Sequence, residues 1–136
     1  MTATPSAPDE LIAAAKAVCG EFRLSADFSA GGVGAAIRAK SGRIYTGIAI
    51  DLACGLGFCA EPAAIAEMLK NRETRIQAIV AVGDDGTILP PCGRCREMMA
   101  QVDRRNLDAQ VVLPGDRSAL LRDLLPEYWM EKRSGA

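Results

Sequence analysis

The chain has 136 residues, of which 49% are hydrophobic and 24% charged, and its formal net charge at pH 7 is −1. This length allows one domain with a substantial core, and the composition is that of an ordinary globular protein. Interspersed charges that nearly cancel argue against a surface for DNA, RNA or an anionic membrane. No apolar run approaches the length of a membrane span, and the first ten residues lack the features of a signal peptide. We expect a cytoplasmic protein with a flexible leader at residues 1–8 and a single domain at residues 9–136.

The first half of the chain predicts a helix and a hairpin. A helix is expected over residues 9–22, with Asp9 as its N-cap and a buried stripe that includes Cys19 and Phe22. The segments 32–39 and 43–50 flank a turn at Lys40, Ser41 and Gly42, which is typical of two antiparallel strands.

Two helix–strand units follow the hairpin. The patterns predict a helix over 61–71, a buried central strand over 76–82, a helix over 93–102 and a strand over 109–113. A short helix is expected over 118–125, after the turn at Pro114 and Gly115. This order of elements predicts a mixed sheet with helices on both faces, which is a three-layer α/β sandwich.

Three of the five cysteines fall where predicted helices begin. Cys59 stands just before the helix at 61–71, and Cys92 and Cys95 form a Cys-x-x-Cys pair at the start of the helix at 93–102. A helix N-terminus offers unpaired N–H groups and the positive end of the helix dipole, and both favour thiolates. Three converging thiolates would suit Zn²⁺ and leave the fourth tetrahedral position open for water, as in catalytic zinc sites. The chain contains no histidine that could replace them.

Glu61 and Arg94 lie beside these cysteines in the sequence. A carboxylate at Glu61 could take a proton from zinc-bound water and pass it to a leaving group. Pro62 is compatible with the first turn of a helix, where its missing N–H costs nothing. A guanidinium at Arg94 could withdraw charge from the thiolates and restore the acidity of the metal; a solvated arginine in the first helical turn explains the residue equally well.

Two segments together form the signature of zinc deaminases: Cys59-Ala60-Glu61 and Pro91-Cys92-Gly93-Arg94-Cys95. With "GRIYTG" and "RDLLPEYW" in addition, the chain resembles the small cytidine deaminases with an all-cysteine zinc site, and among them the blasticidin S deaminases. The resemblance implies an α-β-α sandwich around a mixed sheet of about five strands, in a homotetramer. It also implies one Zn²⁺ per subunit, held by Cys59, Cys92 and Cys95, with Glu61 as the proton shuttle.

The resemblance further implies a reaction and a substrate class. Water would replace the amino group at C4 of a cytosine-type nucleoside and ammonia would leave, while the backbone N–H of Ala60 faces the ring carbonyl. Cytidine, deoxycytidine or a blasticidin S-like analogue would fit this description.

The expected substrate contacts depart from the family pattern. Nucleoside deaminases of this kind usually hold the ribose with Asn-x-Glu on the second strand, where this chain has Ala49 and Asp51, and they carry a phenylalanine where it has Gly31. Near the C-terminus, Tyr128 and Trp129 would either close over a substrate, including one bound in a neighbouring subunit, or pack at a subunit interface.

Three alternatives stay open. Cys54, Cys59, Cys92 and Cys95 could form a closed structural zinc site, although such a site would leave Glu61 without a role. The chain could also be a family member that binds a ligand without turning it over, or a deaminase of a different amino-heterocycle. The fourth zinc ligand separates the first alternative from the enzyme, because it is Cys54 sulfur in one case and water in the other.

Overall fold

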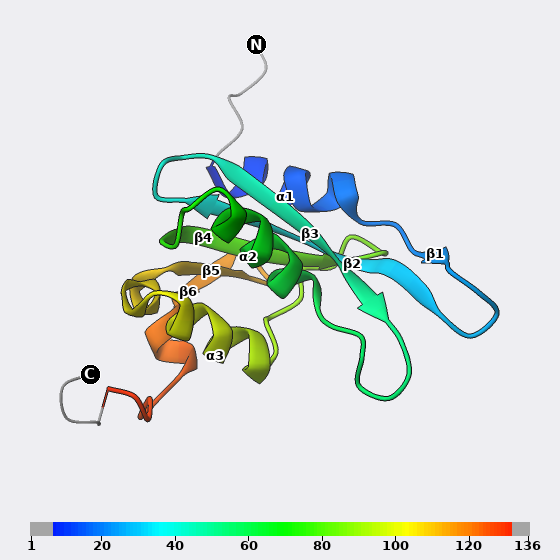
Figure 1. Cartoon of the computed structure of the whole chain (residues 1–136). Coiled ribbons are helices and arrows are strands. Elements are labelled where there is room, and N and C mark those ends of the chain that lie inside the picture. Colours follow the sequence, from blue (N-terminus) through cyan, green and yellow to red (C-terminus); the bar gives the residue numbers. More distant parts are fainter. Residues whose placement is uncertain (1–6, 132–136) are drawn as a thin grey trace, which may run out of the picture.

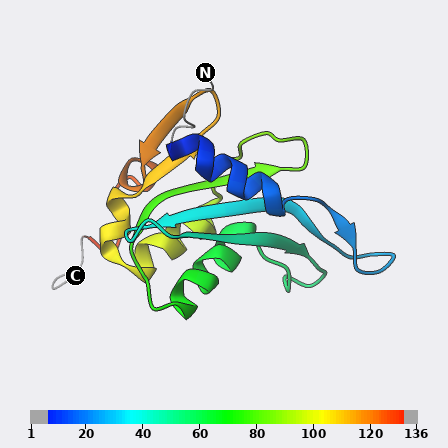
Figure 2. The ribbon, with the colours of Figure 1, turned by 90° about the horizontal axis from the view of Figure 1, so that it is seen from above.

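A mixed sheet of six strands separates one helix from two others (Figure 1). The computed structural model describes residues 7–131. Helix α1 (Ala7–Val18) covers one face of the sheet, and α2 (Ala60–Lys70) and α3 (Gly93–Val102) cover the other. Figure 2, seen from above, shows α1 lying over the strands. The predicted three-layer α-β-α sandwich is confirmed.

The sheet is built around its longest strand, β2, which is antiparallel to three neighbours. The single parallel pair among residues 7–131 joins β4 to β5, and β6 returns antiparallel to β5. The strands are β1 (Phe22–Arg23), β2 (Ser29–Ala39), β3 (Ile44–Asp51), β4 (Ile76–Gly83), β5 (Gln110–Leu113) and β6 (Arg117–Leu120). Two 3₁₀ helices complete the chain, η1 (Arg104–Asp108) and η2 (Leu121–Leu124).

Both faces of β4 are buried from Ile79 to Val82, which explains the apolar run in this part of the strand. Ile79 and Ala81 pack in the core under α2 and α3, whereas Val80 and Val82 pack against α1 on the opposite face. Successive side chains of a strand point to opposite faces, so one run of residues supplies both cores.

Gly47 lets α2 approach the sheet closely. A Cβ atom at this position of β3 would lie 2.3 Å from the backbone nitrogen of Ala64 and 2.6 Å from the Cβ of Ala63, both in α2. Only glycine avoids this overlap, and the close approach fixes the position of α2, whose N-terminus carries Cys59.

Several predicted boundaries were wrong. Helix α1 ends at Val18, and Phe22, expected on its buried stripe, lies in β1 with 51% of its surface exposed. Cys19 follows the helix and packs as predicted, with its thiol 3.5 Å from the carbonyl oxygen of Val82. Residues 118–120, expected to be helical, belong to strand β6 and pair with β5. The sheet therefore gains β1 and β6 beyond the strands read from the sequence.

The predicted leader overlaps the first helix. Ala7 and Pro8, assigned to the leader at residues 1–8, form the start of α1. The remainder of that leader and the last five residues of the predicted domain lie outside the described residues. Among residues 7–131, none of the helices combines the length and apolar character needed to traverse a lipid bilayer.

Candidate metal centre

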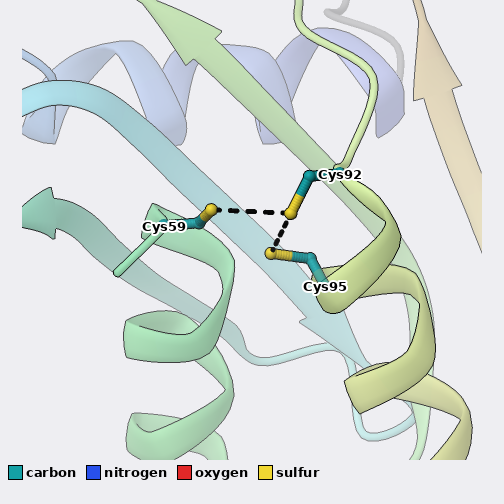
Figure 3. Close-up of side chains that lie close together, drawn as sticks. All are labelled: Cys59, Cys92 and Cys95. Atoms are coloured by element: carbon teal, nitrogen blue, oxygen red, sulfur yellow. Dashed lines mark hydrogen bonds between the residues drawn. The ribbon is translucent and has the colours of Figure 1, made fainter. Parts of the chain in front are cut away.

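Helices α2 and α3 bring three cysteine sulfurs together at their N-termini. Cys59 is the N-cap of α2, Cys92 is the N-cap of α3, and Cys95 lies in the first turn of α3. The Sγ atom of Cys92 is 3.6 Å from that of Cys59 and 3.4 Å from that of Cys95. Figure 3 shows the three side chains pointing toward one another from the two helices. All three ligand atoms lie within 4.8 Å of one another.

These sulfurs match the geometry of a zinc site. Two thiolates on a tetrahedral Zn²⁺, each about 2.3 Å from the metal, lie about 3.8 Å apart. The two short distances observed, 3.6 and 3.4 Å, need little adjustment to reach that value. Thiolate sulfur is also a favoured donor for zinc. The residues present therefore fit the metal.

Cys54 does not join this group. Within residues 7–131, the only cluster of metal-ligating side chains consists of Cys59, Cys92 and Cys95. Cys54 is exposed in the loop before α2, with a backbone φ of 61°. The closed four-cysteine site is thus not assembled among the described residues.

The three thiols differ in acidity. Burial raises the pKa of Cys59 and of Cys95, and the negative charge of Glu61 acts in the same direction on both. Burial also acts to raise the pKa of Cys92, but the nearby backbone N–H of Cys95, the Cys95 and Cys59 thiols and the backbone N–H of Arg94 outweigh it and lower that pKa. Cys92 is therefore the thiol most ready to bind as thiolate.

Glu61 is a buried carboxyl group beside the cysteines. Only 4% of its surface is exposed, and it makes no ion pair among the described residues. Burial raises the pKa of its side chain, while a hydrogen bond from its own backbone N–H acts in the opposite direction. A carboxyl group with a raised pKa next to a candidate metal is well suited to accept and return a proton.

A cavity of about 470 Å³ opens in front of the cluster. Five residues singled out from the sequence line it together with Cys59 and Cys92: Ala49, Asp51, Ala60, Glu61 and Arg94. Most other lining residues are apolar and were missed: Val33, Ile50, Leu52, Phe58, Ala81, Leu89 and Pro90. Phe58 and Pro90 could have been found, because each stands next to a segment of the cysteine signature. A second cavity, of about 560 Å³, lies beside β1 and contains no cysteine.

Gly31 does not line the cavity in front of the cysteines. Its backbone φ is +85°, and a Cβ atom there would lie 2.3 Å from the carbonyl oxygen of Gly20. A phenylalanine at this position would clash with the backbone, so the chain has no room for the aromatic side chain of the family pattern. The nearby residue that reaches the cavity is Val33.

Two arginines of α3 have different environments. Arg94 is exposed at the rim of the cavity, and among residues 7–131 its side chain makes no hydrogen bond to the three sulfurs. Arg96, which the sequence did not single out, donates from Nε to the carbonyl of Pro91 at 2.8 Å. It also donates from Nη1 to the carbonyl of Leu124 at 3.1 Å.

Tyr128 and Trp129 do not reach the cavity of their own chain. The Tyr128 hydroxyl donates to Glu97 Oε2 at 2.6 Å, and Trp129 Nε1 donates to Glu97 Oε1 at 2.9 Å. Tyr128 is 5% exposed and belongs to the core, whereas Trp129 is 49% exposed. A contact with substrate in a neighbouring subunit stays a prediction for both.

Known deaminases are similar to this chain in sequence and in structure. Residues 8–109 match the family model of the cytidine and deoxycytidylate deaminase zinc-binding region. The chain is 33% identical over 96 residues to the cytidine deaminase of Mycobacterium tuberculosis, which covers 70% of each protein. It is 35% identical over 77 residues to blasticidin-S deaminase of Bacillus cereus, covering 50% of this chain and 55% of that protein. The crystal structure of cytidine deaminase from Mycobacterium leprae matches with a TM-score of 0.76 and 28% identity, covering 90% of this chain and 99% of that one.

Proposed function

The chain belongs to the cytidine and deoxycytidylate deaminase family and is a cytidine deaminase-like zinc aminohydrolase; we propose that Cys59, Cys92, Cys95 and Glu61 carry its reaction. The predicted family, the zinc cofactor and deamination of a nucleoside are confirmed. The reaction replaces the amino group of a cytosine-type base by oxygen, consumes one water and releases ammonia.

The observation that carries the proposal is a buried carboxyl group in the same open cavity as three clustered sulfurs. Glu61, Cys59 and Cys92 all line that cavity, and Cys95 completes the cluster from below the surface with no exposed area. A zinc site that only stabilises the fold gives no reason to bury a carboxylate beside its ligands, since burying an unpaired acid costs free energy.

Each residue then has a separate task. The three thiolates hold the ion, which when bound polarises a water molecule and makes it nucleophilic near neutral pH. The carboxylate of Glu61 accepts a proton from the attacking water and passes it to the ring nitrogen; it then accepts the second proton of the same oxygen and passes it to the amino group, which leaves as ammonia. The backbone N–H of Ala60, in the first turn of α2, has no partner within its helix and is available to the carbonyl oxygen of the base.

The cavity walls suggest how the rest of the substrate is held. Most of them are apolar and suit the flat face of a base, and Asp51 at the end of β3 is an acceptor for sugar hydroxyl groups. Ala49 cannot form such a bond with its side chain. We therefore assign recognition of the sugar mainly to Asp51. Cytidine and deoxycytidine are the substrates to test first, with a blasticidin S-like analogue as the third.

The oligomeric state is also part of the proposal. A homotetramer would bury exposed apolar side chains near the cavity mouth, among them Leu56 (71% exposed) and Phe58 (36% exposed). It would also allow the half-exposed Trp129 to reach a neighbouring site. Light scattering coupled to gel filtration tests the assembly, and a monomer with full activity would contradict it.

An ammonia-release screen of the purified, zinc-loaded protein tests the function. Cytidine, deoxycytidine, cytosine and blasticidin S are compared with adenosine and guanine as amino-heterocycles of a different shape. We expect release from at least one of the two cytosine nucleosides and none from the purine compounds. Release from a purine compound alone would support the alternative amino-heterocycle, and no release from any compound at full zinc content would support a binding protein without turnover.

A further inference from the structure

Arg96 fixes the peptide groups on both sides of Cys92. Its side-chain Nε donates to the carbonyl of Pro91, immediately before Cys92, at 2.8 Å. Its backbone N–H donates to the carbonyl of Cys92 itself at 3.0 Å. A single residue thus holds the chain just before and just after one sulfur ligand.

Cys92 depends on such hydrogen bonds more than Cys95 does. Cys95 is fully buried in α3, and packing fixes its rotamer, whereas Cys92 is exposed. The Cys92 side chain makes no capping hydrogen bond to its own helix. The direction of its sulfur is therefore set mainly by the backbone at residues 91–92, which Arg96 holds.

The same guanidinium connects this turn to the C-terminal part of the chain. Nη1 of Arg96 donates to the carbonyl of Leu124, the last residue of η2, at 3.1 Å. The next residue of α3, Glu97, accepts hydrogen bonds from Tyr128 and Trp129. Two adjacent residues of the ligand-bearing helix therefore anchor the segment 121–129, and one of them also contacts the ligand turn.

We propose that Arg96 is a positioning residue, which holds Cys92 in the orientation needed for zinc and ties this ligand to η2. The inference rests on the proposed zinc site but not on the identity of the substrate. Outer-shell hydrogen bonds that orient metal ligands typically contribute 10- to 100-fold to metal affinity. A planar guanidinium can serve two carbonyls at once because its N–H groups point in different fixed directions, which a lysine ammonium on a flexible stem does not reproduce.

The test is the rate at which zinc-loaded protein loses its metal to excess EDTA, followed with a colorimetric zinc indicator. We expect Arg96→Met to lose zinc about tenfold faster than the wild type. Arg117→Met is the matched control, since Arg117 also donates from Nε to a proline carbonyl, that of Pro114 at 3.1 Å, in the turn between β5 and β6. This control should lose zinc at the wild-type rate.

A comparison of metal-free proteins separates positioning from general destabilisation. If Arg96 only stabilises the fold, Arg96→Met lowers the melting temperature of the metal-free protein and leaves the zinc-loss rate unchanged, which overturns the proposal. If Arg96→Met does not fold, Arg96→Lys replaces it and should lose zinc faster than the wild type; an unchanged rate in that variant also overturns the proposal.

The outcome is distinguishable from a failure of the proposed function. Faster zinc loss in the Arg96 variants, with no deamination by the wild type, supports the positioning role and contradicts the enzyme. Deamination by the wild type, with zinc lost at the same rate from all variants, supports the enzyme and contradicts the positioning role of Arg96. A wild-type chain that binds no zinc contradicts both.

Discussion

Cys59 and Cys92 occupy equivalent positions on two helices. Both are N-caps, with φ and ψ of −69° and 166° for Cys59 and of −69° and 168° for Cys92, and their Sγ atoms are 3.6 Å apart. Neither side chain forms a capping hydrogen bond to its own helix. Both sulfurs are thus directed to the space between the helices, where the positive ends of two helix dipoles favour a group of thiolates.

The number of protein ligands to zinc is tested with two cysteine substitutions. Cys54→Ala should retain one zinc per chain and the wild-type melting temperature, since Cys54 is exposed and outside the cluster. Cys92→Ser should weaken zinc binding by more than the roughly 100-fold that marks the upper range for outer-shell changes. Metal analysis after gel filtration measures both. Loss of zinc in Cys54→Ala would instead support Cys54 as a fourth ligand in a closed four-cysteine site.

The close packing of α2 on β3 predicts a large effect for a single methyl group. Gly47→Ala places a Cβ atom 2.3 Å from the backbone nitrogen of Ala64, so the helix carrying Cys59 must move. We expect a loss of about 1–3 kcal/mol in the free energy of unfolding, as for other overpacked sites, and weaker zinc binding. Gly20→Ala is the control, because a Cβ atom there meets nothing within 4 Å. Equal urea-unfolding curves for the two variants would contradict the packing argument.

We expect the hydrogen bonds of Asp103 to make a pH-dependent contribution to the free energy of unfolding. Its carboxylate accepts hydrogen bonds from the Arg105 side chain and the Thr74 hydroxyl, and together they hold its pKa below the ordinary range. Since the folded pKa is depressed, the stabilisation is fully present above the unfolded value of about 3.9 and is lost as pH falls toward the folded pKa. We expect Asp103→Asn to lower the free energy of unfolding by about 1–2 kcal/mol at pH 7.

The control for this substitution is Asp108→Asn. Asp108 pairs with Arg122 on the surface, and its side chain is 63% exposed, so its loss should cost less than about 1 kcal/mol. Urea unfolding at pH 7 and near pH 3 measures the effects. A difference between Asp103→Asn and the wild type that does not shrink at the lower pH would contradict the assignment.

Recognition of the sugar is tested at Asp51. If its carboxylate accepts a hydroxyl hydrogen bond, Asp51→Ala should lower kcat/KM for cytidine roughly tenfold, which corresponds to about 1.4 kcal/mol. The effect should appear mainly in KM, because the contact is distant from the reacting carbon. Asp123→Ala, which removes an exposed acid on η2, serves as the control. An unchanged KM in Asp51→Ala would place recognition of the sugar elsewhere.

The sequence predicted the cysteine cluster and the position of Glu61 beside it, but it predicted fewer of the residues that surround them in the cavity. Helix α3 was predicted with its observed bounds, Gly93–Val102, because a Cys-x-x-Cys start and a strict apolar period both mark it. The cysteines and Glu61 were found because metal ligands and their carboxylate recur at fixed spacing. These patterns extend over only a few neighbouring residues, so they can be recognised without knowledge of the tertiary structure.

The errors occurred where tertiary contacts decide the structure. Leucines at 120, 121, 124 and 125 mimic a helical period, but Gly115 and Asp116 adopt positive φ and turn the chain back, so residues 117–120 pair with β5. The hydrogen bond from Arg96 to Leu124 was likewise hidden, because the two residues are 28 positions apart in the sequence. No periodicity or motif records such a contact.

The most direct test of the account is Glu61→Gln, measured for both zinc content and turnover. Glutamine preserves the shape of this 4%-exposed side chain but cannot move the proton. Glu67→Gln, farther along α2, is the control, because the Glu67 side chain accepts a hydrogen bond from the backbone N–H of Thr46 and does not line the cavity. We expect one zinc per chain in both variants, near wild-type turnover in Glu67→Gln, and a loss of at least about 100-fold in kcat for Glu61→Gln. A Glu61→Gln protein that retains zinc and deaminates a cytosine nucleoside at the wild-type rate would contradict it.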